Sequence, residues 1–346
     1  MKYPKSLQKG GSIGFPAPSF GCATEPYYSA FQNGLEKWQE LGYQTNPGEN
    51  AYENSGVGIS NTPEKCGEEL TKMYLDEKND ILISCGGGEL MCEILDYVDF
   101  DAIKNAEPKW FVGYSDNTNM TYLLATICDT AAVYGPCAGT YGMEPWHESL
   151  WDMHALLTGE KTKMTGYAAW EKESLKSEEN PLAPYNIKEP CELKIWNGST
   201  WQESCDKISM SGRILGGCMD CLINLIGTNY DKTTEFINKY NEDGILWFIE
   251  ACELNVFSMR RAMWQMEHAG WFQHVNGFVF GRPRNGESMM GLDEYEAVLT
   301  VAKKYNVPVI MDADMGHLPP MIPLIIGSLA DITVRGNQME VDMKLV

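Results

Sequence analysis

The sequence lacks several features that would assign it at once to a class of protein. No apolar run approaches the roughly eighteen residues of a membrane-spanning helix, and residues 1–6 lack the apolar core of a secretory signal. Basic residues are outnumbered, with 27 Lys and Arg against 48 Asp and Glu and a net charge of −21. Because nucleic-acid binding requires basic patches, we expect no nucleic-acid partner. We also expect no membrane partner and a cytoplasmic location.

Metal-ligand and cofactor motifs are scarce as well. The 11 cysteines have no framework spacing, which favours reduced, mostly buried thiols. Cys218 and Cys221 form a Cys-x-x-Cys pair, but no second pair and no histidine pair at zinc spacing accompanies them. We interpret this pair as structural, with a zinc site or a redox pair as the alternative. A dinucleotide-binding fingerprint is also missing, and we expect neither a metal nor a cofactor.

The first part of the chain alternates strand and helix patterns. Apolar strands are predicted at 12–17 and 80–84, and the spacing of apolar residues predicts a helix over 27–41. Thr62 precedes Pro63 as the cap of a second helix. This alternation predicts a parallel sheet covered on both faces, and ligands of such sheets bind beyond the carboxyl ends of the strands.

The composition of the chain changes after its first half. We predict an N-terminal α/β domain over residues 1–160, a linker with an inserted substrate loop over 161–211, and a C-terminal α/β domain over 212–346. The middle segment is polar with scattered aromatics, whereas the last carries apolar strands such as 244–249 and 307–311.

Ser115 follows an apolar strand pattern and precedes a helical one. A serine on such a turn exposes its Oγ beside the N-terminus of a helix, as in the nucleophile elbow Gly-x-Ser-x-Gly. Asn117 takes the place of the last glycine of that motif. The alternative is that Ser115 caps the helix.

A serine nucleophile requires a base and an acid that orients it. His317 follows a buried strand on a Gly-His-Leu-Pro-Pro loop, where its imidazole can face a cleft. Glu250 ends the apolar strand 245–249, and an acid at that place requires a partner. The order Ser, Glu, His is that of other α/β serine hydrolases. The alternatives are a loop histidine bonded to backbone, and a Glu250 paired with Arg260 or Arg261.

Gly86, Gly87 and Gly88 follow the predicted strand 80–84 and offer bare backbone amides. Gly87 and Gly88, together with the N–H of Asp116, are candidates for an oxyanion hole. A nucleotide phosphate is the alternative ligand of the glycine run. However, the run matches neither a dinucleotide fingerprint nor a Walker loop, and an acid, Glu89, follows it.

Together these segments resemble the LD-carboxypeptidase family of serine peptidases, and within it the branch of microcin C immunity proteins. The similarity runs nearly from end to end. It rests on residues 7–19, 83–88, 95–101 and 113–118 and on the strand ends at Glu250 and His317. The chain departs from the family pattern at Gly11, Cys66 and Cys218, where an acid, an arginine and an asparagine are usual.

The resemblance implies an α/β fold with an N-terminal Rossmann- or flavodoxin-like parallel-sheet domain. A C-terminal swivelling β/α domain would follow, with the active site between the two domains and a homodimer as the assembly. It also implies amide hydrolysis without a metal. Ser115 would attack the substrate, His317 would carry the proton, and Glu250 would orient the imidazole.

The substrate implied by the immunity branch is an acylated aminoacyl nucleotide or a sulfamoyl adenylate, on whose base an aromatic residue of an inserted loop stacks. Trp170, Tyr185 and Trp196 are the candidates for that contact, and the alternative is that they close the domain interface. The family's other substrate is a murein tetrapeptide. A non-catalytic binder of small acylated nucleotides or peptides is a third interpretation.

Overall fold

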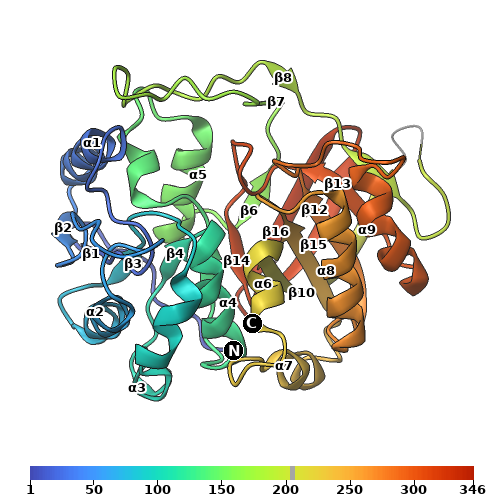
Figure 1. Ribbon diagram of the computed structural model, residues 1–346, viewed down its shortest axis with the longest axis horizontal. Coiled ribbons are helices and arrows are strands. Elements are labelled where there is room, and N and C mark those ends of the chain that lie inside the picture. Colours follow the sequence, from blue (N-terminus) through green and yellow to red (C-terminus); the bar gives the residue numbers. More distant parts are fainter. Residues whose placement is uncertain (203–206) are drawn as a thin grey trace. The chain divides into compact units, whose positions relative to one another are not determined.

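The computed structural model describes residues 1–202 and 207–346, and it divides the chain into two compact units (Figure 1). The first unit comprises Met1–Lys161 and Glu173–Asn186, and the second comprises Thr162–Lys172 and Ile187–Val346. The segment 161–211, predicted as linker and loop, is therefore shared between both units. No helix among the described residues is long and apolar enough to cross a membrane.

The first unit is built on strands that pair in parallel in the order β5-β4-β3-β1-β2. The strands are β1 Ser12–Phe15, β2 Gln44–Pro47, β3 Ile81–Ile83, β4 Phe111–Gly113 and β5 Ala132–Tyr134. The helices are α1 Tyr27–Glu40, α2 Pro63–Leu75, α3 Phe100–Asn105, α4 Thr118–Thr126 and α5 Glu148–Leu157. Short 3₁₀ turns are η1 Met91–Tyr97, η2 Ser115–Asn117 and η3 Ala138–Gly142.

Local sequence signals explain the helices of this unit. The Thr62 hydroxyl accepts a hydrogen bond from the N–H of Lys65 at 3.4 Å, and Pro63 occupies the first turn, as predicted. Helix α1 buries Phe31, Leu35 and Trp38, which lie three to four residues apart and therefore share one face. The predicted parallel α/β architecture of this unit is confirmed.

The second unit holds a mixed sheet in the order β6-β16-β15-β10-β11-β12-β13-β9, whose central strands β10 to β13 are parallel. Its strands are β6 Lys163–Thr165, β9 Lys194–Trp196, β10 Ile208–Cys218, β11 Ile245–Glu250, β12 Val275–Gly281, β13 Val309–Ala313, β15 Leu329–Arg335 and β16 Gln338–Lys344. The short strands β7 Ala169–Trp170, β8 Glu189–Pro190 and β14 Leu324–Ile326 lie outside this order. The helices are α6 Met219–Leu225, α7 Thr233–Lys239, α8 Val256–His268 and α9 Glu294–Ala302, and α9 is followed by the 3₁₀ turn η4 Lys303–Tyr305.

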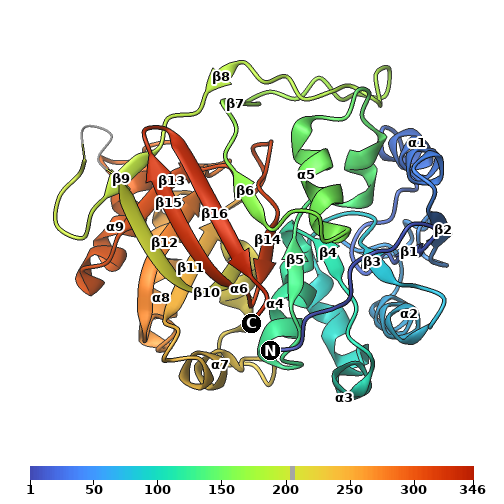
Figure 2. The same ribbon diagram turned by 180° about the vertical axis from the view of Figure 1, so that it is seen from behind.

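Helices α8 and α9 cover one face of this sheet, as the two opposite views in Figures 1 and 2 show. Strand β11 is buried along its whole length, and its Trp247 stacks on Trp271 with ring centres 5.8 Å apart. The carboxyl ends of β10 to β13 meet at one edge of the sheet because these strands are parallel. Glu250 ends β11 at this edge, and the loop of His317 leaves β13 there. The prediction of a second α/β unit is confirmed.

Candidate active site

Ser115 lies on the sharp turn between β4 and α4 that the sequence predicts. Its φ is +62°, a left-handed backbone conformation that costs a residue with a side chain about 1–3 kcal/mol. Its backbone N–H donates to the hydroxyl of Tyr134 at 3.2 Å. The N-caps of the turn 115–117 and of α4 are Tyr114 and Asn117, so Ser115 is the cap of neither. The assigned cap positions therefore fall on its neighbours, and the role of Ser115 as nucleophile stays a prediction.

The glycine run lies against this serine. A Cβ atom built on Gly87 would lie 3.1 Å from Cβ and 3.2 Å from Oγ of Ser115, so only glycine leaves the hydroxyl its present space. A Cβ atom on Gly88 would overlap the hydroxyl of Ser19. The side-chain amide of Asn117 donates to the carbonyl of Gly86 at 2.7 Å and so ties the nucleophile turn to the glycine run.

The side chain of Asp116 holds together the segments around the nucleophile turn. Its carboxylate accepts hydrogen bonds from the hydroxyl of Ser19 at 2.6 Å, the N–H of Met91 at 2.9 Å and the amide of Asn119 at 3.1 Å. Burial raises the pKa of Asp116 to about 6. From the sequence, only the backbone N–H of Asp116 is a candidate for a role in the site. An aspartate in the first turn of a helix is a common cap, and that pattern gave no sign of partners so distant in the chain.

We predict that Gly87→Ala slows acylation of Ser115 without unfolding the protein. The added methyl group would crowd the hydroxyl and shift it relative to the N–H of residue 87, and we expect labelling by a serine-directed fluorophosphonate to slow about 100-fold, the cost typical of weakening one oxyanion contact. Gly139→Ala in the same unit is the matched control, because its Cβ atom would meet nothing closer than 3.9 Å. If both variants were labelled at the same rate, the assignment of Gly87 to the active site would be contradicted.

Glu250 and His317 form a pair in the second unit, as the sequence analysis predicts. Nδ1 of His317 lies 2.8 Å from Oε2 of Glu250. Glu250 is only 1% exposed. A buried carboxylate accepts hydrogen bonds, so we assign the proton of this contact to Nδ1, which leaves proton exchange to Nε2. Oε2 of Glu250 therefore contacts His317. Arg260 and Arg261 were the alternative partners.

The charge state of His317 follows from this pair. Burial alone disfavours the imidazolium, but the charge of the Glu250 carboxylate and the hydrogen bond that the imidazole donates to it outweigh this cost. The pKa of His317 is therefore held well above its ordinary value. Glycine at position 316 is required here, because its φ is +90° and a Cβ atom would lie 2.6 Å from Oε2 of Glu250.

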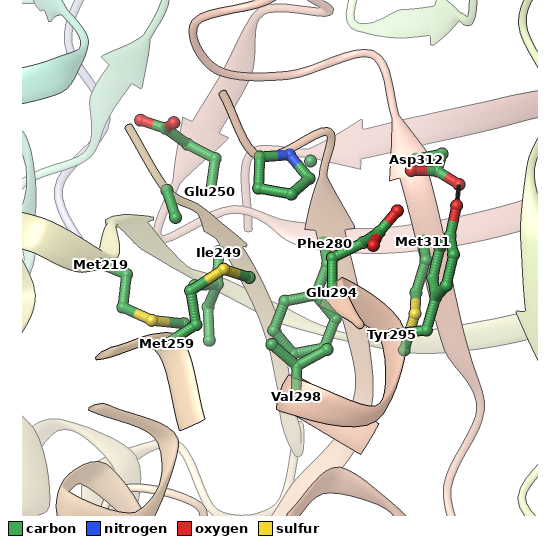
Figure 3. A pocket seen from close by; sticks show the side chains of 13 residues that line it. Met219, Ile249, Glu250, Met259, Phe280, Glu294, Tyr295, Val298, Met311 and Asp312 are labelled. Atoms are coloured by element: carbon green, nitrogen blue, oxygen red, sulfur yellow. Dashed lines mark hydrogen bonds between the residues drawn. The ribbon is translucent and has the colours of Figure 1, made fainter. Parts of the chain in front are cut away.

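A small cavity of about 20 Å³ borders Glu250, room for about one water molecule. Apolar side chains line much of it, including Met219, Ile249 and Met259 (Figure 3). On another side the hydroxyl of Tyr295 donates to the carboxylate of Asp312 at 2.9 Å. Glu250 therefore has mainly apolar neighbours on this side, and a carboxylate in such surroundings interacts more strongly with His317 than it would in water.

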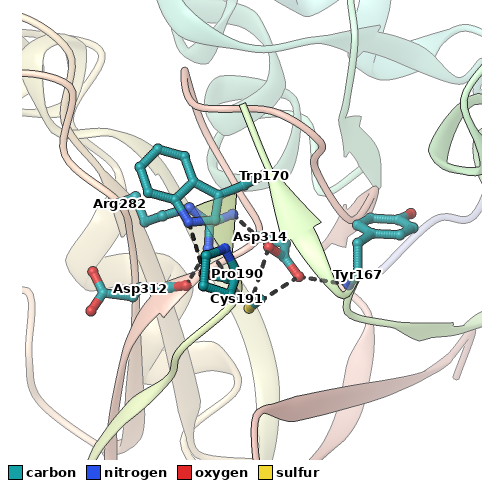
Figure 4. A network of polar contacts seen from close by, with 7 residues as sticks. All are labelled: Tyr167, Trp170, Pro190, Cys191, Arg282, Asp312 and Asp314. Carbon is teal, nitrogen blue, oxygen red and sulfur yellow. Dashed lines mark hydrogen bonds and ion pairs between the residues drawn. The ribbon is translucent and has the colours of Figure 1, made fainter. Parts of the chain in front are cut away.

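A buried ion pair fixes the strand end that leads to His317 (Figure 4). Nη2 of Arg282 lies 2.5 Å from Oδ1 of Asp314, and the two side chains are 5% and 2% exposed. The guanidinium also donates to the carbonyl of Asp312 at 2.5 Å, and Asp314 accepts the N–H of Tyr167 at 2.8 Å. Because Asp314 lies three residues before His317, this pair positions the start of the histidine loop.

The three candidate aromatic residues lie in different surroundings. Trp170 packs over the Arg282 guanidinium at 5.0 Å (Figure 4). Tyr185, in the first unit, contacts the ring of His147 at 5.5 Å. Trp196 pairs with Val309 at the amino end of β13, the end opposite to the loop of His317. A substrate contact by any of the three stays a prediction.

Both thiols of the Cys-x-x-Cys pair are buried, Cys218 at 1% and Cys221 at 9% exposure. The pKa of Cys218 is raised well above its usual value, mainly by a hydrogen bond with Cys221 and secondly by burial. This is typical of an inert structural thiol. Among the residues of the described ranges, no three His, Cys, Asp or Glu side chains group as metal ligands.

Comparison with known proteins gives consistent matches to both units. Residues 13–135 match the LD-carboxypeptidase N-terminal domain, and residues 211–332 match the LD-carboxypeptidase C-terminal domain. The microcin C7 self-immunity protein MccF of Escherichia coli is 24% identical over 93% of this chain and 90% of its own length. The structure of MccF in complex with glutamyl sulfamoyl guanosine has a TM-score of 0.80 at 20% identity, covering 99% of this chain and 98% of MccF. An MccF-like protein from Bacillus anthracis has a TM-score of 0.78 at 21% identity, covering 99% of this chain and 100% of its own.

Proposed function

This chain belongs to the LD-carboxypeptidase family, and on that premise we propose that it hydrolyses an amide bond with Ser115, His317 and Glu250 as catalytic triad. The observation that carries the proposal is the short contact between Nδ1 of His317 and the buried Glu250. It is the geometry that an orienting acid and a general base require. Ser115 is the proposed nucleophile, because it lies on a strained turn like that of a nucleophile elbow.

The proposed reaction has two steps. Oγ of Ser115 attacks the substrate carbonyl and gives its proton to Nε2 of His317, which passes it to the leaving amine as the acyl-enzyme forms. Water then attacks the ester, again through His317, and restores the serine. The N–H groups of Gly87, Gly88 and Asp116 are the proposed donors to the oxyanion.

We propose an acylated aminoacyl nucleotide or a related sulfamoyl adenylate as the substrate class. Related solved structures support this choice, because MccF has been solved with aspartyl sulfamoyl adenosine and with glutamyl sulfamoyl guanosine. An MccF-like protein of Streptococcus pneumoniae has been solved with AMP. A nucleobase would require an aromatic face, which Trp170, Tyr185 or Trp196 would offer. A homodimer in the cytoplasm remains part of this proposal.

The first test is labelling by a fluorophosphonate probe, followed by mass spectrometry of the intact protein. We expect a single adduct on the wild type and none on Ser115→Ala, with unchanged circular dichroism. Absence of an adduct on the wild type, with the same probe active on another serine hydrolase, would favour a non-catalytic binder.

The second test compares two substrates with the same enzyme preparation. We expect turnover of an aspartyl sulfamoyl adenylate and its loss by at least about 1,000-fold in Ser115→Ala. Turnover of a murein tetrapeptide alone would keep the triad and replace the substrate class. Binding of the adenylate by both proteins without turnover would instead indicate a binding protein.

A further inference from the structure

The turn that follows Glu250 is held by a carboxylate from another strand end. Asp220, in the first turn of α6, accepts three consecutive backbone N–H groups. They belong to Cys252 at 3.0 Å, Glu253 at 2.8 Å and Leu254 at 3.2 Å. Successive N–H groups of this kind form a concave anion-binding turn, and here the anion is a side chain of the same protein.

The carbonyl side of the same turn is held by the loop after β12. The N–H of Arg284 donates to the carbonyl of Ala251 at 3.1 Å, and the amide of Asn285 donates to the carbonyl of Glu253 at 2.9 Å. The turn is therefore fixed by both neighbouring strand ends. The contacts of Asp220 involve a charged side chain, and hydrogen bonds to charged groups are roughly twice as strong as those between neutral groups.

The turn is also linked to His317. It closely follows Glu250, whose Oε2 lies 2.8 Å from Nδ1 of His317, and the thiol of Cys252 donates to Oε1 of Glu253 at 3.6 Å. The thiol of Cys218 donates to Asp220 at 3.4 Å, which directs the carboxylate of Asp220 from inside the sheet. Asp220 is thus joined to the imidazole through the turn 252–254 and Glu250.

We propose that Asp220 is a positioning residue of the Glu250–His317 pair: it fixes the turn 252–254, which closely follows Glu250, and thereby keeps the Glu250 carboxylate in place against the imidazole. This inference deepens the proposed function and rests on it for its kinetic consequence. Asp220 does not contact the reacting atoms in this scheme. It acts through the backbone of the turn.

Asp220→Asn is the informative substitution, because the two side chains have nearly the same shape. The asparagine keeps one acceptor oxygen but turns an NH₂ group toward at least one of the three N–H donors. Two donors then face each other, and the turn must open at that point.

The experiment measures three quantities in the wild type, Asp220→Asn and Asp231→Asn. Asp231 is the matched control because it also accepts backbone N–H groups, from Gly227 at 3.4 Å and Thr233 at 3.2 Å, in the loop between α6 and α7. The quantities are kcat and KM, the pH profile of kcat/KM, and the rate at which iodoacetamide alkylates Cys252 relative to Cys92.

For Asp220→Asn we expect kcat to fall about tenfold with KM changed less than about twofold, as for loss of a well-positioned base. The rising limb of the pH profile should move to lower pH, because a Glu250 that is held less firmly raises the pKa of His317 less. Alkylation of Cys252 should become about tenfold faster, since restricting a thiol to one geometry limits its access. Asp231→Asn should change each quantity less than about twofold.

Two results would overturn the proposal. Unchanged alkylation of Cys252 in Asp220→Asn would show that Asp220 does not hold the turn, and equal losses in both variants would indicate a general structural role. The alkylation rates do not depend on turnover. If the wild type hydrolyses neither substrate, the proposed function fails while the positioning role of Asp220 is still tested.

Discussion

Replacing Glu250 by Gln is expected to lower kcat/KM by about 10³- to 10⁴-fold while the protein stays folded. A glutamine can present its NH₂ group to Nδ1 of His317, which favours the tautomer that carries its proton on Nε2. That tautomer cannot accept the proton of Ser115. The loss should appear in kcat rather than in KM, because Glu250 stabilises the imidazolium that forms only during the reaction.

The same substitution should also change the pH profile. Since Glu250 holds the pKa of His317 above its ordinary value, the neutral base that catalysis requires forms only at higher pH. For the wild type we expect kcat/KM to rise with pH, with a midpoint above about 6.5, the ordinary value for histidine. In Glu250→Gln the residual activity should rise at lower pH. A midpoint that stays fixed would contradict the assignment of this limb to His317.

Glu253→Gln is the control for both effects. This residue lies three positions further along the chain and is exposed, so its charge is screened by water. We expect its kcat/KM to change less than about threefold. A loss equal to that of Glu250→Gln would make Glu253 the orienting acid in place of Glu250.

Replacing Arg282 by Met is expected to destabilise the second unit by about 3–5 kcal/mol. The substitution leaves the carboxylate of Asp314 buried without its cation, since Asp314 is only 2% exposed. Chemical denaturation followed by tryptophan fluorescence measures this loss, because Trp170 packs on the guanidinium and other tryptophans of the unit report its core.

The double variant Arg282→Met/Asp314→Leu separates the cost of an unpaired charge from the cost of lost packing. It should recover a large part of the stability, because an apolar pair of similar volume requires no desolvation of charge. Lys304→Met is the control for removing a cation from an exposed pair. Lys304 contacts Glu267 at 2.7 Å with a side chain that is 52% exposed, and its loss should cost about 1 kcal/mol or less. Equal losses at Arg282 and Lys304 would contradict the role of burial.

Much of the fold could be predicted from local patterns. The cap at Thr62, the apolar face of α1 and the buried strand β11 each depend on residues within one element, and the structure has all three. The prediction was weakest for the segment 161–211. Its short strands pair with different parts of the chain, and such pairing leaves little periodicity in the sequence.

The candidate site shows the same division. The contact between Glu250 and His317 could be predicted because each lies at or just beyond the carboxyl end of a strand, at one edge of the sheet. The side chains that position them were missed. Asp220 contacts a turn 32 to 34 positions away, and the carboxylate of Asp116 reaches Ser19 across 97 positions. No spacing rule relates such partners, so only the folded chain reveals them.

The division of the chain into units has a practical consequence for producing the halves separately. The backbone passes from one unit to the other after residues 161, 172 and 186. A single cut at any of these points therefore leaves one half without a piece of itself. Residues 173–186, for example, supply Leu182, whose carbonyl accepts the N–H of Glu144, to the first unit. Expression of 1–161 alone would omit this segment, and because the three crossings divide the chain into four segments, no single division of the gene yields two complete units.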